Sequence, residues 1–431
     1  MIVRTAIFIL LLQSLTSPLF AQSYVFATHA GGPSNDYGTR VAVDKEDNIY
    51  VLGEFSGNAA FDSIILHGQG LWNVFVAKYD PHGHVVWAAM AASASGPQSD
   101  ILANGLAVDA AGNLYITGWF MSAVTFGDST YQSRGSTDIY LAKLNNAGHL
   151  VWMRQAGGVG VGTFGQDIAA GLALDRQGSC YIVGSYNTDA KFGNISLSSP
   201  NVNEVFVAKY DSSGNAQWAT SGGAYGASHL GMGVAVDEAG NSFITGSFFN
   251  KLSLGADTLD AVDAEKKMFV AKLDPHGAFV WAKKVGTGGY YGTSEGIALD
   301  NKGNLYLAGY FRSSIQIGGN DFSYNYGYKY ATLITKYDTA GGFKWVRRTE
   351  GADHQALSKQ LTVDDHGNVY VTGGLSNNTS FGPITIPTTT SQSMAFIAKL
   401  DSSGAVEFVK TIVPQGNANG RASPLCTLEI V

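Results

Sequence analysis

One pattern occurs six times along the chain, and it constrains the fold more than any other feature. Residues 296–311 give the clearest copy, Gly-Ile-Ala-Leu-Asp-Asn-Lys-Gly-Asn-Leu-Tyr-Leu-Ala-Gly-Tyr-Phe. An aspartate at one fixed position marks each copy: Asp44, Asp109, Asp175, Asp237, Asp300 and Asp364. Successive aspartates are 62 to 66 residues apart. A supersecondary unit of this size cannot bury its apolar face alone, so the repeats must pack against one another.

Each repeat contains four strand-like runs. The first two read Gly-Ile/Leu/Val-Ala-Leu/Val-Asp and Asn-x-Tyr/Phe-hydrophobic-x-Gly, joined by a tight Asp-x-x-Gly-Asn turn or a close variant. The third contains Phe-Val-Ala-Lys, as at 75–78, and the fourth carries Trp87, Trp152, Trp218, Trp281, Trp345 or, in the last copy, Phe408. Four antiparallel strands per repeat are a propeller blade, so we expect an all-β β-propeller of four-stranded blades.

The two ends of the chain leave two ways to close the ring. Residues 24–32 resemble the end of a repeat, and a strand displaced to the N-terminus is a usual device for removing an open sheet edge. Residues 426–431 fall where a seventh first strand would lie. We favour six four-stranded blades with accessory end strands; the alternative is seven, with a reduced closing blade.

Composition agrees with one large repeat domain. The 431 residues are 45% hydrophobic and 12% aromatic, with 54 glycines and only 14% charged residues, as in turn-rich β structure. Residues 1–21 carry Arg4 and a short apolar run, which predicts a cleavable signal peptide followed by a single propeller domain over 22–431. The expected location is secreted: periplasmic, extracellular or on the outer cell surface. The apolar run is too short to be a transmembrane segment.

Charge and cysteine content narrow the range of partners. A net charge of −7 disfavours nucleic acid. Cys180 stands where most other copies have Leu, Ile or Val, so we expect a small buried hydrophobe and not a disulfide with Cys426.

The repeated Ala-x-Asp-x-x-Gly-Asn-x-Tyr-x-x-Gly and Phe-x-Ala-Lys-Tyr-Asp motifs resemble a known family, the secreted bacterial β-propeller repeat proteins (SBBP-type repeats). The resemblance extends over roughly residues 24–410. More distantly, the chain is similar to NHL-like six-bladed propellers. The resemblance implies an extracytoplasmic propeller and specifies no activity.

The sequence predicts that the two faces of the propeller differ. Turns between strands one and two, and between three and four, share one face, which is uniform here and is called the uniform face below. Connections between strands two and three, and between blades, share the other face. The segments that begin 17 residues after each marker aspartate differ in length and sequence from one repeat to the next. We expect binding at this variable face, because variable loops on a rigid frame commonly carry function.

Departures from the repeat mark the expected mouth of the central channel on the variable face. The candidate residues here are Asp36, Arg40, Asp100, Asp167, His229, Glu295 and Lys359. Acidic side chains and a histidine around a channel can bind a cation, and some six-bladed propellers hold calcium there. The alternative is that the aspartates cap the turns between blades. We expect no other cofactor.

Aromatic residues concentrate in the fourth and fifth repeats. The ligand-binding candidates are Trp119, Tyr290, Tyr291, Tyr310, Tyr324, Tyr326 and Tyr328, with Tyr330 nearby in sequence. Exposed Tyr and Trp rings suit sugars or extended peptides, which can stack on a flat apolar face while hydroxyls hydrogen-bond. The alternation at 324–330 also fits a hairpin with one packed face.

The lysine of strand three and the tryptophan of strand four have structural interpretations. We expect each lysine to pair with the marker aspartate of its own repeat, as Lys272 with Asp237, and not to form a basic ring. The tryptophans are expected to pack one blade on the next.

Two functions stay open. Because the usual catalytic motifs are absent from the sequence, we favour a secreted or cell-surface scaffold that binds a glycan or an extended peptide or protein, as a monomer. The alternative is a propeller hydrolase or lyase whose site at the channel mouth uses Asp36, Asp167, His229 and Glu295.

Overall fold

The computed structural model describes residues 30–93, 99–159, 166–198, 203–224, 228–262, 265–288, 290–324, 329–351, 355–376, 378–387 and 394–412. Every regular element among these residues is a β-strand. No helix in this part of the chain has the length and apolar character needed to cross a membrane. The predicted signal peptide and Cys426 lie outside the described residues, whereas Cys180 is fully buried, as predicted.

The strands form six successive four-stranded antiparallel units. The first three are β1 (Asp36–Val43), β2 (Ile49–Phe55), β5 (Asn73–Tyr79), β6 (Val85–Ser93); β7 (Asp100–Val108), β8 (Leu114–Phe126), β9 (Ser129–Leu144), β10 (Leu150–Gly157); and β11 (Ile168–Leu174), β12 (Cys180–Tyr186), β15 (Glu204–Tyr210), β16 (Ala216–Gly222). The last three are β17 (His229–Val236), β18 (Ser242–Phe248), β21 (Lys267–Leu273), β22 (Phe279–Lys284); β23 (Tyr290–Leu299), β24 (Asn304–Ile317), β26 (Ala331–Asp338), β27 (Phe343–Glu350); and β28 (Gln355–Val363), β29 (Val369–Ser376), β32 (Met394–Leu400), β33 (Val406–Ile412).

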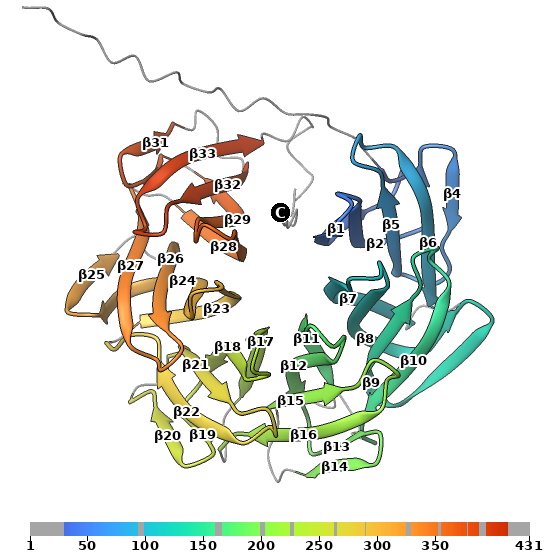
Figure 1. Ribbon diagram of the computed structural model, residues 1–431, viewed down its shortest axis with the longest axis horizontal. Helices are drawn as coiled ribbons and strands as arrows, with labels where there is room; N and C mark the ends of the chain where they lie inside the picture. The colour runs from blue at the N-terminus through green and yellow to red at the C-terminus, as the bar shows by residue number, and fades with distance from the viewer. Residues whose placement is uncertain are drawn as a thin grey trace, which may run out of the picture.

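The units stand around a common centre, with the first strand of each innermost (Figure 1). These inner strands pack in chain order, β1 on β7, then β11, β17, β23 and β28. The described residues show no packing of that extent between β28 and β1, and Figure 1 shows the ring open there. The all-β, propeller-like architecture is therefore confirmed, while the described sheets do not close the ring.

A second hairpin in each unit was not predicted from the sequence. Its strands are β3 (Asn58–Phe61) with β4 (Ile64–His67), β13 (Asp189–Phe192) with β14 (Ile195–Ser198), β19 (Lys251–Leu254) with β20 (Asp257–Asp260), β30 (Thr379–Phe381) with β31 (Ile384–Ile386), and the extended ends of β8 with β9 and of β24 with β25 (Asn320–Tyr324). The hairpin pairs with the outer strand of the preceding unit, as Ala156 does with Phe192. The segment that the sequence suggests is the start of a variable loop is therefore a regular hairpin that links two units.

The chain enters the first unit in the same way. Gly31 forms a β-bridge with Ala60 of β3, much as Gly223 does with Ser253 of β19. The end of the 24–32 segment thus occupies the position that the end of an outer strand takes at later junctions, as its sequence predicted. Residues 24–29 lie outside the described part of the chain.

The hydrophobic core lies mainly between units, as expected for repeats that cannot fold alone. One cluster joins Tyr50 and Leu52 of the first unit to Leu114 and Ile116 of the second. Four further clusters join the second to the third, the third to the fourth, the fourth to the fifth and the fifth to the sixth. Burial between sheets is thus the main force that orders the array.

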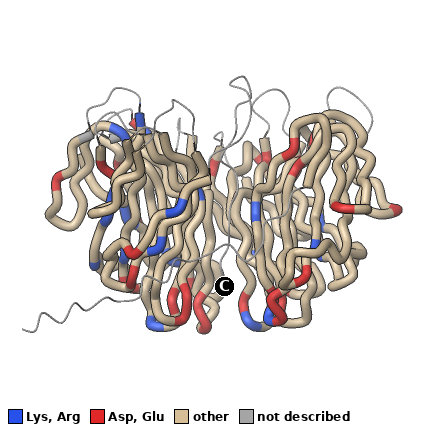
Figure 2. Tube along the Cα trace, turned by 90° about the horizontal axis from the view of Figure 1, so that it is seen from above, with Lys and Arg blue, Asp and Glu red and all other residues tan. Residues whose placement is uncertain are grey.

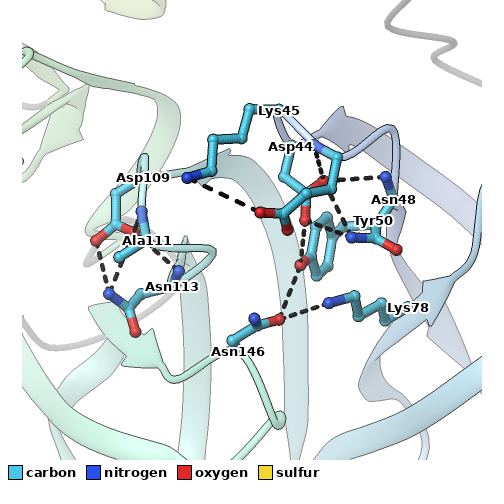
Figure 3. A network of polar contacts seen from close by, with 10 residues as sticks. Asp44, Lys45, Asn48, Tyr50, Lys78, Asp109, Ala111, Asn113 and Asn146 are labelled. Atoms are coloured by element: carbon cyan, nitrogen blue, oxygen red, sulfur yellow. Dashed lines mark hydrogen bonds and ion pairs between the residues drawn. The ribbon is translucent and has the colours of Figure 1, made fainter.

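The marker aspartates build the turns of the uniform face. Asp44 accepts hydrogen bonds from the backbone N–H groups of Glu46 and Asn48, at 2.9 and 3.0 Å, and from the Tyr50 hydroxyl at 2.9 Å (Figure 3). Burial alone would raise the pKa of Asp44, but the hydrogen bonds from Asn48, Tyr50 and Glu46 outweigh it, so the pKa is lowered. Asp and Glu positions accordingly gather at the turns along one rim of the ring (Figure 2).

The strand-four tryptophans link neighbouring units, as predicted. Trp87 Nε1 donates to the carbonyl of Asn146 at 3.0 Å, and a Cβ on Gly148 would lie 2.9 Å from the Trp87 ring. Gly148 has φ +81°, so glycine serves both the turn and the close approach of the ring. Equivalent bonds run from Trp152 to Ser212, Trp218 to Pro275 and Trp345 to Ser402.

The strand-three lysines are structural, but their predicted partner is wrong for Lys272. That ammonium lies 5.4 Å from the centre of the Phe243 ring and forms no ion pair with Asp237 or Asp300. All six lysines lie 4.8 to 5.7 Å from the ring centre of the strand-two aromatic residue. Among the described residues, ion pairs with the marker aspartate occur in the second and third units only. The cation–π contact is thus the shared feature.

Candidate functional site

The central channel is lined by residues that lie within the innermost strands, next to the register shift in each strand. A cavity of about 90 Å³ lies among them. Its wall includes Arg40, Asn104, Ala170, Met232, Glu295 and Gln360, one from each of the six units. Because these side chains depart from the repeat, each unit presents a different chemical group to the channel.

Three of the predicted channel-mouth residues instead cap connections between units. Asp36 accepts the N–H of Gly32 at 2.6 Å, and Asp167 accepts the N–H of Gly158 at 2.8 Å. His229 Nε2 accepts the N–H of Ala224 at 3.2 Å. Each therefore accepts a backbone N–H group from the connection that leads into its own unit, as in the turn-capping alternative.

Burial explains the shifted titration of two of these caps. It raises the pKa of Asp167 to about 7, against the lowering effect of hydrogen bonds from Asn187 and Gly158, and the nearby Asp138 adds to the rise. Burial lowers the pKa of His229 to about 4. Asp167 is 2% exposed and His229 is 0% exposed, so neither side chain can reach a substrate in this conformation.

Two further acids near the channel are also held by backbone N–H groups. Asp100 accepts from Trp72. Glu54, which the sequence argument did not select, accepts the N–H of Ala103 at 2.9 Å, and burial raises the pKa of Glu54 to about 7. Glu54 occupies the strand-two position where Trp119 and Tyr310 stand in other units. This departure from the repeat could have identified Glu54 from the sequence.

The cation proposed for the channel mouth has no ready set of ligands in the described part of the chain. There, no group of three or more His, Cys, Asp or Glu side chains is arranged to hold a metal ion. Calcium binding at this position therefore stays a prediction.

Three tyrosines come together on the fifth unit. The ring centres of Tyr310 and Tyr330 are 5.2 Å apart in an edge-on arrangement, and those of Tyr291 and Tyr330 are 6.1 Å apart. Tyr291 lies near the start of β23 and Tyr330 just before β26, while Tyr310 lies in the middle of β24. Each ring is partly exposed. We call these three residues the tyrosine cluster.

Basic side chains border the tyrosine cluster. The Arg312 guanidinium lies 4.6 Å from the Tyr291 ring centre and 5.9 Å from that of Tyr330. The Lys266 ammonium lies 6.0 Å from the Tyr291 ring centre. Burial and, to a smaller extent, the charge of Lys359 lower the pKa of Lys266, while Glu295 opposes the shift. The cluster thus combines aromatic faces with positive charge.

An ion pair connects the tyrosine cluster to the channel. Lys359 Nζ lies 2.9 and 3.0 Å from the two carboxylate oxygens of Glu295, and 5.7 Å from the ring centre of Tyr310. The Tyr310 hydroxyl donates to Glu295, and burial together with the Glu295 charge raises its pKa. Two residues predicted for the channel mouth, Glu295 and Lys359, and one ligand-binding candidate, Tyr310, therefore form one network.

Of the other aromatic candidates, Trp119 does not join this cluster. Trp119 lies on β8 in the second unit, across the ring from β24 (Figure 1). The backbones of Tyr290 and Tyr324 both pair with Ser313, which places them at neighbouring strand ends. Tyr326 and Tyr328 lie outside the described residues. Sequence reasoning did not select Arg312 or Lys266, whose positions carry no motif.

Comparison with known protein families identifies the type of repeat. A beta-propeller repeat model, SBBP, matches residues 25–54. The chain carries an SBBP beta-propeller repeat. An uncharacterized WD repeat-containing protein, L264 of Acanthamoeba polyphaga mimivirus, is 25% identical to it over 423 residues. That similarity covers 78% of this chain and 29% of the relative, so this SBBP-repeat chain spans less than a third of the relative's length.

Solved structures with similar arrangements are distant in sequence. A protein of unknown function from Dyadobacter fermentans is 11% identical with a TM-score of 0.41, covering 84% of this chain and 94% of its own. A PL25 polysaccharide lyase, an ulvan lyase, is 9% identical with a TM-score of 0.48, covering 88% and 86%. A quinonprotein alcohol dehydrogenase-like protein from Bacteroides thetaiotaomicron is 11% identical with a TM-score of 0.38, covering 87% and 66%.

Proposed function

We propose that this protein is a secreted or cell-surface β-propeller scaffold that binds a glycan or an extended peptide through the variable face of its fifth unit. The observation that carries the proposal is the tyrosine cluster, in which Tyr291, Tyr310 and Tyr330 meet beside Arg312. Rigid, partly exposed aromatic rings supply contact area at low entropic cost, and their hydroxyls can orient a polar ligand.

The surrounding charges favour a ligand with polar or acidic groups over a purely apolar one. Arg312 lies within 3.7 Å of Glu265, whose side chain is 46% exposed, so water screens this pair and it can be exchanged for a ligand contact at little cost. The Tyr291 face beside Arg312 then offers stacking and a charged hydrogen bond at one place.

The alternative function, a hydrolase or lyase at the channel mouth, has weaker support. Asp36, Asp167 and His229 belong to three different units and bond to their own inter-unit turns, and Glu295 is neutralised by Lys359. The strongly shifted pKa values of Asp167 and His229 follow from burial, which also keeps these two side chains from a substrate. A binding role therefore agrees better with this geometry.

The proposal includes the assembly and location of the protein. We propose six four-stranded blades whose ring is completed by the end segments, acting as a monomer after removal of residues 1–21. The net charge of −7 argues for partners other than nucleic acid.

A glycan and peptide array probed with the protein lacking residues 1–21 tests the proposed function. We expect a small set of related glycans or peptides to bind, and Tyr291→Ala to lose those signals while keeping its β-sheet circular dichroism. An array without reproducible ligands, or with ligands retained by Tyr291→Ala and Tyr330→Ala alike, would overturn it.

A further inference from the structure

A second cavity lies at the outer junction of the fifth and sixth units, away from the tyrosine cluster. Its volume is about 320 Å³, at the lower end of the range of about 300 to 1,000 Å³ typical of small-molecule sites. Strand β27 forms one wall, and the turn after β30 and the start of β33 form the other. Apolar side chains dominate the lining, among them Phe322, Val346, Phe381, Leu400 and Val406.

The repeat provides a matched comparison at the junction of the second and third units. The cavity there is about 200 Å³ and is lined by Gln155, Asn194, Asn215 and Tyr210 at the positions of Arg348, Pro383, Ala405 and Leu400. Tyr210 is 1% exposed, so its ring fills space that Leu400 leaves open. The junction of the fifth and sixth units is therefore both larger and more apolar than its counterpart.

Arg348 lacks the buried partner that its counterpart has. Gln155 donates to the carboxylate of Asp138, which is fully buried, and to the carbonyl of Gln132 at 2.7 Å. In the fifth unit the position of Asp138 is taken by Ala331, so no acid stands at that position for Arg348.

The contacts that Arg348 does make are weak. Its Nη1 donates to the carbonyl of Ser323 at 3.4 Å, and its Nη2 lies 3.4 Å from Glu350, whose side chain is 62% exposed. The Nε group is buried without a hydrogen-bond partner, and the guanidinium lies 5.0 Å from the Phe322 ring centre. A water-exposed ion pair contributes little, so most of the hydrogen-bonding capacity of this guanidinium is still available.

We propose that this cavity binds a small amphipathic carboxylate. The carboxylate accepts hydrogen bonds from the Arg348 guanidinium, which lines the cavity. The apolar tail lies among Phe381, Leu400 and Val406, where it is removed from water. The site is independent of the function proposed for the tyrosine cluster, because the two share no residue.

Titration calorimetry of the protein with octanoate and with 1-octanol tests the proposal. These probes have the same tail and differ in the carboxylate. We expect octanoate to bind one site, and Arg348→Gln, which copies the counterpart junction, to weaken octanoate by about tenfold or more and to leave octanol unchanged.

Filling the cavity gives the second arm of the test. Leu400→Tyr, which copies Tyr210, should abolish binding of both probes, while Gln155→Ala at the counterpart junction should change neither. If Leu400→Tyr fails to fold by circular dichroism, Val406→Phe serves the same purpose. No octanoate binding to the parent protein at millimolar concentration, or binding that survives both Arg348→Gln and the filling variant, would overturn the proposal.

Discussion

Lys359 on β28 holds the carboxylate of Glu295 on β23 at 2.9 Å, joining the innermost strands of the fifth and sixth units beside the channel. The two side chains are 30% and 14% exposed, so the pair is only partly screened by water. Glu295 also accepts from Tyr310 and offsets the positive charge of Lys266. It is therefore the centre of a network in which Lys359 is one of several partners.

This asymmetry predicts unequal effects of the two substitutions. We expect Glu295→Gln to lower the free energy of unfolding by about 2 to 3 kcal/mol, because Lys359 and Lys266 then face each other without an anion. Lys359→Gln should cost about 1 kcal/mol, since Lys266 still faces Glu295. Urea denaturation of the two variants checks the order, and equal losses would show that Glu295 acts through Lys359 alone.

The tyrosine cluster predicts a loss of binding without a loss of stability. Tyr291→Ala should weaken the ligand found on the array by about 1 to 3 kcal/mol, the scale of a lost aromatic hot spot, because its ring is partly exposed beside Arg312. Trp119→Ala, across the ring, is the control and should bind as the parent does. Affinity and melting temperature of both variants decide the matter; unchanged affinity with a large fall in melting temperature would assign Tyr291 to packing.

Glu54 predicts a pH dependence of stability. Burial raises the pKa of Glu54 to about 7, with Asp100 adding to the rise and Ala103 and Arg40 opposing it, whereas an unfolded glutamate has a pKa of about 4.3. The folded protein thus keeps a proton that the unfolded chain releases. The associated stabilisation is full below about pH 4 and is lost as the pH rises to about 7.

Glu54→Gln tests this sign, because the amide oxygen can still accept the Ala103 N–H but cannot titrate. Relative to the parent, the variant should lack a fall in unfolding free energy of about 2 to 3 kcal/mol between pH 4 and pH 7. Denaturant titrations at several pH values give the measurement, with the exposed Asp62→Asn as the control. Parallel pH profiles for parent and Glu54→Gln would contradict the assignment.

Lys209 and Lys272 occupy the same repeat position and predict different costs. Lys209 Nζ lies 3.4 Å from Asp175 as well as over the Tyr181 ring, whereas Lys272 lies over the Phe243 ring with no acidic partner among the described residues. We expect Lys209→Met to lower the unfolding free energy by about 1 kcal/mol more than Lys272→Met, since only the former leaves a largely buried carboxylate without its cation. Thermal and urea unfolding of both variants compare them, and equal costs would mean that the ring contact alone determines stability.

Local chemistry is what the sequence by itself determined. The turn at Asp44 forms from hydrogen bonds to Glu46 and Asn48, within four residues, so its six copies could be recognised along the chain. Four strands per repeat followed from that turn and from the strand-three and strand-four motifs. The packing of Trp87 on the next unit was predictable as well, because the same residue recurs at the same place in every repeat but the last.

Only the tertiary structure decided which side chains meet across units. Lys359 and Glu295 are 64 residues apart, and no motif marks either of them. The second hairpin of each unit could not be recognised as regular structure because its pairing partner is the outer strand of the preceding unit, which lies far away in the sequence. The open space beside Arg348 exists because Leu400, which comes from a neighbouring unit, is smaller than its counterpart Tyr210. Such sites depend on how the units pack on one another, because this packing sets the distances between residues that are far apart in the sequence.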